Sequence, residues 1–228
     1  MTKPDRGVAL VTGASAGIGR ATAEALRDAG YRVFGTSRKP APQRFDGITM
    51  LTGDVTSDAS VAKLVDDILA EAGRIDLLVN NAGVGMFGGA EESSIAQVQA
   101  LFDVNLFGVI RMTNAALPSM RRRGEGRIIN MGSVLGLVPA PYSAHYSAAK
   151  HALEGYSESL DHEVRVFNIR VSVIEPAFVR TVFDQNGIEP DSVLKEYDHA
   201  RAGVDALLRD VMHKADRPEV VADVVVKA

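Results

Sequence analysis

A tyrosine and a lysine four residues apart are the side chains in this sequence that point most directly to chemistry. On a helix, Tyr146 and Lys150 would share one face. A tyrosine hydroxyl titrates near pH ~10, and a cation held beside it favours the phenolate and lowers that pKa. Tyr146 can then act as a general acid or base, with Ser133 donating to a reacting oxygen. The same spacing also occurs on ordinary helix faces, so the rest of the chain must decide.

Alternating strands and helices are predicted to position these residues. Short apolar runs predict strands at residues 8–12, 31–36, 48–51, 75–79, 127–131 and 169–174. Helical spacing predicts helices at 18–29, 58–72, two within 95–120, 143–167, one or two within 191–214, and one from 217. This alternation indicates an α/β fold, a single domain over residues 1–228 with a parallel sheet and helices on both faces.

The composition is that of a soluble globular protein and argues against several kinds of site. The chain carries a net charge of −4, which does not favour a nucleic-acid partner. It has no cysteine for a disulfide or thiolate site, and its histidines lack metal-ligand spacing, so we expect no metal. No apolar run reaches the ~18 residues of a membrane helix, and residues 1–7 lack the apolar segment of a signal peptide. We therefore expect a cytoplasmic protein with no membrane partner.

A glycine-rich loop joins the first predicted strand to the first predicted helix. Gly13, Gly17 and Gly19 let the backbone turn tightly and approach a phosphate closely. The helix that follows offers free N–H groups and the positive end of its dipole. The spacing is Gly-x-x-x-Gly-x-Gly rather than Gly-x-Gly-x-x-Gly. A glycine-rich turn without a ligand is the alternative, but the strand before and the helix after favour dinucleotide binding.

These motifs, in this order, resemble those of the classical short-chain dehydrogenases/reductases. Residues 12–19 resemble the glycine motif of that family, and residues 80–83 (Asn-Asn-Ala-Gly) resemble its second signature. The family's catalytic tetrad is matched in order and spacing by Asn105, Ser133, Tyr146 and Lys150. The resemblance covers residues 8–181 and implies a Rossmann-type, doubly wound sheet with the cofactor across the carboxyl ends of the strands.

The resemblance assigns a role to each member of the tetrad. Tyr146 would exchange a proton with the carbonyl or alcohol oxygen, and Ser133 would donate to that oxygen. Lys150 would lower the tyrosine pKa and hold the nicotinamide ribose. Asn105 would support a water that links Lys150 to solvent, although by itself it also fits a helix kink satisfied by backbone groups.

The resemblance also implies a set of cofactor contacts. Gly13, Ser15, Ile18 and Gly19 would hold the phosphates. Asp54, which alone would fit a turn or helix cap, and Val55 would meet the adenine ring. The remaining contacts would come from Asn81, Ala82, Gly83, Tyr146, Lys150, Pro176 and Thr181. Pro176 is followed by alanine where the family usually has glycine, and Thr181 matches the threonine that contacts the carboxamide.

The end of the second predicted strand bears on the choice of cofactor. Residues 35–39 read Gly-Thr-Ser-Arg-Lys, with no carboxylate to bind a ribose 2′-hydroxyl. Ser37 stands where NAD-preferring members tend to carry aspartate. The Arg38 guanidinium can form a bidentate, charge-assisted contact with a phosphate. The alternative is that Arg38 and Lys39 form a basic turn that is simply exposed to solvent. In the glycine loop, Ala16 stands where some NADP enzymes carry a second basic residue. We expect NADP(H) to be preferred over NAD(H).

Apolar residues gather in the segments where the resemblance places the substrate pocket and lid. They are Met86, Phe87, Leu135, Leu137, Val138, Tyr142, Phe178 and Phe183. They favour an apolar carbonyl or alcohol, and residues 85–92 and 142–156 are similar to hydroxysteroid-, retinol- and carbonyl-reductase-type members. We expect a helical lid at about 183–214 and a missing C-terminal strand.

The predicted function is hydride transfer between NADP(H) and a small apolar carbonyl or alcohol. The alternative is a non-catalytic NADP(H)-binding sensor or regulator on the same fold, which has no need to keep the tetrad. Small residues on the Tyr146 helix permit close helix approach, and we hypothesise a homodimer or homotetramer. These small residues are Ala148, Ala152, Gly155 and Ser159.

Overall fold

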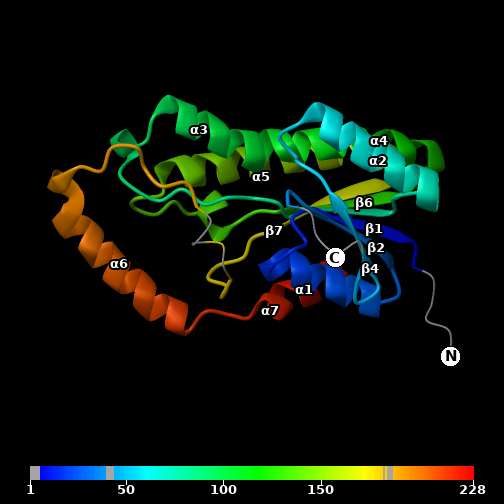
Figure 1. Cartoon of the computed structure of the whole chain (residues 1–228). Helices are drawn as coiled ribbons and strands as arrows, with labels where there is room; N and C mark the ends of the chain where they lie inside the picture. The colour runs from blue at the N-terminus through cyan, green and yellow to red at the C-terminus, as the bar shows by residue number, and fades with distance from the viewer. Residues whose placement is uncertain (1–5, 40–43, 182, 184–186) are drawn as a thin grey trace.

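The computed structural model describes residues 6–39, 44–181, 183 and 187–228 (Figure 1). Within these residues the sheet has seven strands in the order β3-β4-β2-β1-β5-β6-β7. The strands are β1 (Val8–Val11), β2 (Arg32–Ser37), β3 (Arg44–Phe45), β4 (Ile48–Thr52), β5 (Leu77–Asn80), β6 (Gly126–Met131) and β7 (Ile169–Ile174). The strand order reverses between β1 and β5, which is where doubly wound sheets bind ligands at their carboxyl edge.

The parallel sheet expected from the sequence is confirmed. Each of the six expected strands is present, and the pairings among these six are all parallel. The sequence did not predict β3, which pairs antiparallel with β4 over two residues. A pair this short carries too little hydrophobic periodicity to be found by pattern.

Helices cover both faces of the sheet, as predicted. They are α1 (Gly17–Asp28), α2 (Asp58–Ala72), α3 (Ile95–Phe102), α4 (Gly108–Arg123), α5 (Ala144–Val164), α6 (Asp198–His213) and α7 (Pro218–Lys227). Short helical turns are η1 (Ala90–Glu92), η2 (Asp103–Phe107), η3 (Val134–Gly136), η4 (Arg165–Phe167) and η6 (Lys195–Tyr197). In Figure 1, α2, α4 and α5 lie on one face and α1 and α7 on the other.

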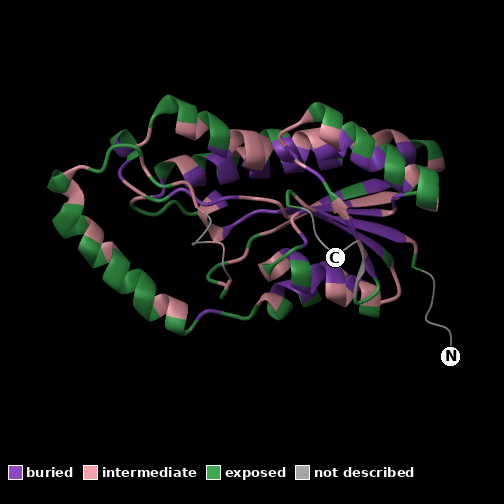
Figure 2. Ribbon diagram, viewed as in Figure 1, coloured by how far each residue is buried: buried purple, intermediate pink, exposed green. Residues whose placement is uncertain are grey.

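The alternation of side chains along β1 shows why both faces are covered. Val8 and Leu10 pack with the helices α2, α4 and α5, whereas Ala9 and Val11 pack with α1 and α7. Successive side chains of a strand point to opposite faces, so an uninterrupted apolar strand needs a helical layer on each side. Figure 2 shows these strands buried between the two layers.

Helix α6 lies at one end of the molecule and packs less closely than the others (Figures 1 and 2). None of its residues, all of which the structure describes, is buried. The segment before it is held by the buried carboxylate of Glu92, which accepts the Leu194 N–H (2.7 Å) and pairs with Arg201. The predicted lid at 183–214 includes residues 184–186, which lie outside the described residues, and the lid stays a prediction.

The chain's helices also bear on membrane insertion. Of the helices in the described ranges, none is both long enough and apolar enough to cross a bilayer.

Asp161 ties the end of α5 to the edge strand β7. Its Oδ1 accepts hydrogen bonds from the Arg170 Nε and the Val171 N–H, both at 2.9 Å. Its Oδ2 accepts from the Arg165 guanidinium at 2.6 Å. The hydrogen bond from Arg170, followed by that from Val171, holds the pKa of Asp161 well below its ordinary value. The folded state therefore gains stability from Asp161 above the unfolded-state pKa near ~3.9.

Replacing Asp161 by asparagine is expected to lower the free energy of unfolding at pH 7 by about 1–3 kcal/mol, because charge-assisted hydrogen bonds are lost. The contribution of Asp161 disappears as pH falls below ~5, so mutant and wild type should converge in acid. Urea denaturation at pH 7 and at low pH measures both effects. Asp67→Asn, in an exposed pair with Lys63, is the control and should change stability by less than ~1 kcal/mol. A deficit for Asp161→Asn that is the same at both pH values would contradict this account.

Candidate active site

Tyr146 and Lys150 lie on the buried face of α5, as their spacing predicted. Each side chain belongs to a residue only 6% exposed, and the Lys150 Nζ lies 5.7 Å from the centroid of the Tyr146 ring. The same Nζ donates to the Met131 carbonyl at 2.7 Å, which anchors the lysine to the end of β6. Burial lowers the pKa of Lys150 to about 8, with the charge of Glu154 acting in the opposite direction. A cation is thus held beside the tyrosine ring near neutral pH.

Aromatic and aliphatic side chains enclose the tyrosine. The Tyr146 ring lies 5.6 Å from that of Phe87 and 6.0 Å from that of Phe183, measured between centroids. Val84, Met86 and Leu101 complete a small apolar cluster with it. This cluster brings together the segments at 84–87 and 183 that the sequence predicted for the substrate pocket. It also lowers access of water to the phenol.

Ser133 lies directly after β6, at the carboxyl edge of the sheet. It is 8% exposed, and its Oγ accepts the Leu135 N–H at 3.2 Å as the cap of the turn η3. That turn packs against α5, and a Cβ built on Gly136 would lie 3.2 Å from the Lys150 carbonyl oxygen. Accepting one hydrogen bond leaves the Ser133 hydroxyl proton able to point toward another oxygen.

Asn105 lies in η2, a π-helical segment that separates α3 from α4. It is 1% exposed, its Nδ2 donates to the Val84 carbonyl (2.8 Å), and its Oδ1 accepts the Val84 N–H (2.9 Å). A Cβ on Gly83 would lie 3.2 Å from this Oδ1. Such π-helical segments occur often at functional sites. The structure therefore shows the backbone-satisfied kink, and the water relay through Asn105 stays a prediction.

The glycine loop and the Asn-Asn-Ala-Gly segment are joined by hydrogen bonds. The Thr12 Oγ1 accepts the N–H groups of Asn81 and Ala82, both at 3.0 Å. The Asn81 side chain donates to the carbonyls of Thr12 (2.9 Å) and Gly13 (3.3 Å). These bonds connect the carboxyl ends of β1 and β5, so the two motifs form one surface. Asn81 supports the loop in this way, and its contact with an adenine ribose stays a prediction.

The geometry at the start of α1 suits the phosphate site that the sequence predicted. Gly13 and Gly17 have φ angles of +66° and +55°, which side chains other than glycine rarely adopt. The N-cap residue, Ala16, makes no side-chain hydrogen bond to the first turn, which contains Ile18 and Gly19 and follows the exposed Ser15. First-turn N–H groups without a capping side chain suit a phosphate. The predicted phosphate-binding residues are therefore brought together.

The predicted adenine end lies after β2 and β4. Ser37 ends β2 and is partly buried, and Arg38 after it is exposed. The Asp54 carboxylate accepts the Thr56 N–H (2.9 Å) and hydroxyl (2.8 Å), which together with the charge of Arg38 lower its pKa. Val55 is 7% exposed. Asp54 is thus a turn residue, the alternative that its position allowed, and it also lies near enough to Arg38 to interact electrostatically.

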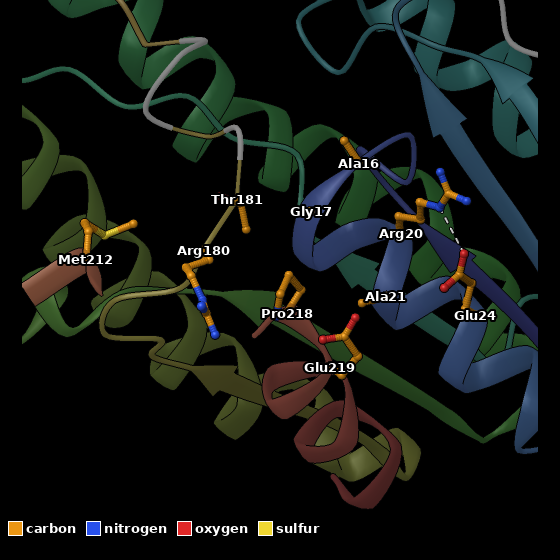
Figure 3. Close-up of a pocket in the computed structure, with 10 residues that line it drawn as sticks. All are labelled: Ala16, Gly17, Arg20, Ala21, Glu24, Arg180, Thr181, Met212, Pro218 and Glu219. Atoms are coloured by element: carbon orange, nitrogen blue, oxygen red, sulfur yellow. Dashed lines mark hydrogen bonds and ion pairs between the residues drawn. The ribbon is translucent and has the colours of Figure 1, made fainter. Parts of the chain in front are cut away.

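Thr181 faces the beginning of α1 from the segment after β7. A Cβ built on Gly17 would lie 3.2 Å from the Thr181 methyl carbon. Figure 3 shows both residues at a pocket of about 520 Å³ that Arg20 and Arg180 also line. Pro176 is joined to the Ser133 turn, because its carbonyl accepts the Val134 N–H at 3.0 Å. Neither arginine belongs to one of the sequence motifs, and the two come to line one pocket only because α1 and the segment after β7 meet.

The comparison with known families agrees with this geometry. The sequence model for the short chain dehydrogenase family matches residues 7–192, which is most of the chain. The protein therefore belongs to the short chain dehydrogenase family of oxidoreductases.

Particular relatives come from bacteria and mammals. A 3-ketodihydrosphingosine reductase from Bacteroides thetaiotaomicron is 44% identical over 179 residues, which cover 78% of this chain and 66% of that protein. Retinol dehydrogenase 8 from Bos taurus is 36% identical, with 96% of this chain and 76% of that protein covered. The chain thus spans about two thirds to three quarters of the length of these relatives. A short chain dehydrogenase/reductase from Burkholderia phymatum, solved in complex with NAD, superposes with a TM-score of 0.85 at 29% identity, covering 100% of this chain and 87% of that one.

Proposed function

We propose that this protein is an NADP(H)-dependent oxidoreductase that interconverts a carbonyl and a secondary alcohol on an apolar small molecule. The observation that carries the proposal is the buried Lys150 ammonium beside the Tyr146 ring, on a helix packed against the turn that presents Ser133. A protein that only senses a dinucleotide needs none of these three side chains together.

In the reductive direction, the Ser133 hydroxyl donates a hydrogen bond to the substrate carbonyl oxygen and holds it near the phenol. Tyr146 gives its proton to that oxygen as the carbonyl carbon becomes tetrahedral, so the product is an alcohol. Lys150 stabilises the phenolate that remains, because its positive charge lies beside the ring. When bound, the nicotinamide supplies the hydride in this direction and accepts it in the other.

The residues present fit a dinucleotide. The uncapped first turn of α1 and the positive φ angles of Gly13 and Gly17 provide the phosphate site. A 2′-phosphate would meet Arg38, whose guanidinium can form a forked, charge-assisted contact. Arg38 also interacts electrostatically with Asp54. The preference for NADP(H) therefore depends on whether Arg38 pairs with the 2′-phosphate or with the Asp54 carboxylate. The related Burkholderia protein was solved with NAD, so the cofactor must be tested directly.

Replacing Arg38 by alanine is expected to lower kcat/KM for NADPH by about 10- to 100-fold, the loss expected for a hydrogen bond to a charged group. The value for NADH should stay nearly constant, because NADH has no 2′-phosphate. Steady-state kinetics with both cofactors measures the ratio. Lys39→Ala removes the neighbouring charge and is the control. Equal losses with NADPH and NADH would contradict a contact between Arg38 and the 2′-phosphate.

The apolar cluster around Tyr146 supports an apolar substrate. Phe87, Leu137, Val138 and Phe178 are also more than a third exposed near the predicted pocket segments. The names of the two relatives, a reductase of 3-ketodihydrosphingosine and a retinol dehydrogenase, agree with this class of substrate. Consumption of NADPH and NADH with aliphatic, aromatic, steroid and retinoid carbonyls tests the proposal. Tight NADPH binding without turnover of any carbonyl would instead favour the sensor.

Three further expectations belong to this proposal. Residues 183–214 would close over the bound substrate as a helical lid, and the protein would act in the cytoplasm. The small residues of α5 (Ala148, Ala152, Gly155 and Ser159) would support a homodimer or homotetramer. Sedimentation of a monomer would contradict the last of these.

A further inference from the structure

Glu154 is a buried carboxyl to which the mechanism above assigns no role. It follows Lys150 by four residues on α5, so the two side chains leave the same face of the helix. The residue is only 9% exposed, and its Oε1 has no hydrogen-bond partner among the described residues. An unsatisfied buried polar atom is costly and calls for an explanation.

The Glu154 carboxyl packs against the turn that carries Ser133. A Cβ built on Gly132 would lie 2.6 Å from the Glu154 Oε1, and one built on Gly136 would lie 3.0 Å from it. These two glycines stand on either side of Ser133 in the sequence. The carboxyl therefore occupies the space that side chains at 132 and 136 would need. Glu154 thus lies one helical turn from Lys150 and packs against the turn that carries Ser133.

Glu154 also lines a groove of about 390 Å³ between α5 and β7. The charged groups that act on it electrostatically are Lys150, His151 and Glu158 of α5, and Glu175, which directly follows β7. Asp161 and His162 line the same groove, but the Asp161 carboxylate already accepts hydrogen bonds from Arg165, Arg170 and the Val171 N–H. The turn after β6, residues 132–136, contains no acidic, basic or histidine side chain.

The electrostatics of this group follow from these neighbours. Burial, followed by the charge of Glu175, raises the pKa of Glu154 to about 7, while Lys150 acts in the opposite direction. In turn the Glu154 carboxylate raises the pKa of Lys150 against the larger effect of burial. Both groups titrate close to neutral pH, so the ionisation of one changes the pKa of the other.

We propose that Glu154 is a positioning residue of the reaction, which braces the Ser133 turn and keeps Lys150 protonated at alkaline pH. The proposal rests on the function proposed above for Tyr146 and Lys150. Glu154 does not touch the reacting atoms. It acts through the lysine, because a carboxylate one helical turn away favours the ammonium form that Tyr146 requires.

The test combines kinetics with a direct titration of the lysine. Glu154→Gln keeps the shape of the side chain and removes its charge. The alkaline limb of the profile of kcat against pH should move to lower pH by on the order of 1 unit, the size expected for neighbouring charges in a protein. Turnover in that alkaline range should fall by up to about 10-fold, since each pH unit changes the protonated fraction by that factor. Carbon-13 NMR of labelled lysine in the cofactor-free protein, assigned with Lys150→Met, should show the same shift.

Two further variants separate this role from packing. Glu175→Gln removes a like charge that acts on Glu154, so Glu154 should ionise at lower pH, and the inflection that its ionisation causes in the Lys150 resonance should move to lower pH with it. This variant alters an exposed residue and also decides the matter if Glu154→Gln fails to fold. Glu163→Gln removes an exposed charge elsewhere on α5 and should move neither the Lys150 titration nor that of Glu154.

A uniform loss of turnover at every pH, with the Lys150 titration unmoved, would overturn the proposal and leave Glu154 a packing residue. A Lys150 resonance with no inflection where Glu154 ionises, in the wild type and in Glu175→Gln alike, would overturn it as well. If the wild-type protein turned over no carbonyl, the proposed function would fail, and the NMR titration would still decide whether Glu154 governs Lys150.

Discussion

Replacing Tyr146 by phenylalanine is expected to lower kcat by about 10²- to 10⁴-fold, the usual contribution of a positioned general acid or base. The ring is packed between Phe87 and Phe183, so the phenylalanine ring should keep its place and only the hydroxyl is lost. The Kd for NADPH, followed by the fluorescence of the bound nicotinamide, should change little. The loss would then lie in the chemical step and not in folding or binding.

The matched control is Tyr156→Phe, a tyrosine on the same helix that interacts with Thr113 and lies away from Lys150. Its turnover should stay near that of the wild type. If Tyr146→Phe retained turnover within a few-fold while Lys150→Met lost it, the proton would have to come from another group. Equal losses in both tyrosine variants would point to a general weakening of α5.

Replacing Gly19 by alanine is expected to abolish most cofactor binding. A Cβ at this position would overlap the Gly13 carbonyl oxygen and the Asn81 side-chain nitrogen. The first of these is backbone of the glycine loop and cannot move aside without changing the phosphate site. We expect the Kd for NADPH to rise by more than roughly 10-fold, which corresponds to ~1.4 kcal/mol. Overpacking of this kind also costs about 1–3 kcal/mol of stability.

Gly203→Ala is the control for this substitution. Gly203 is exposed on α6, and a Cβ there would have no neighbour within 4 Å in the described structure. Alanine should stabilise the helix by about 0.5–1 kcal/mol and leave the Kd for NADPH unchanged. Isothermal calorimetry and thermal unfolding of both variants make the comparison. Unaltered NADPH affinity in Gly19→Ala would show that the glycine loop does not hold the phosphates.

The sequence was sufficient for the sheet, because its strands carry short apolar stretches that alternate along the chain with segments of helical spacing. β1 is such a strand, and its buried residues pack alternately against the two layers of helices. The helix of Tyr146 and Lys150 was equally predictable from its spacing. The two-residue strand β3 and the π-helical segment around Asn105 were not, because each departs from the periods of 2 and 3.6 residues that pattern analysis detects.

The order of motifs along the chain therefore determined the family and the fold, and it pointed to Tyr146, Lys150 and Ser133 as the proposed reactive set. Only the tertiary structure decided how their charges are tuned. It buried Lys150 and Glu154 and packed Gly132 and Gly136 against the Glu154 carboxyl. It also placed Glu175 within electrostatic range of Glu154, and Arg38 within electrostatic range of Asp54. Burial and charge interactions depend on which distant segments pack together, and hydrophobic periodicity within one segment carries no information about those partners.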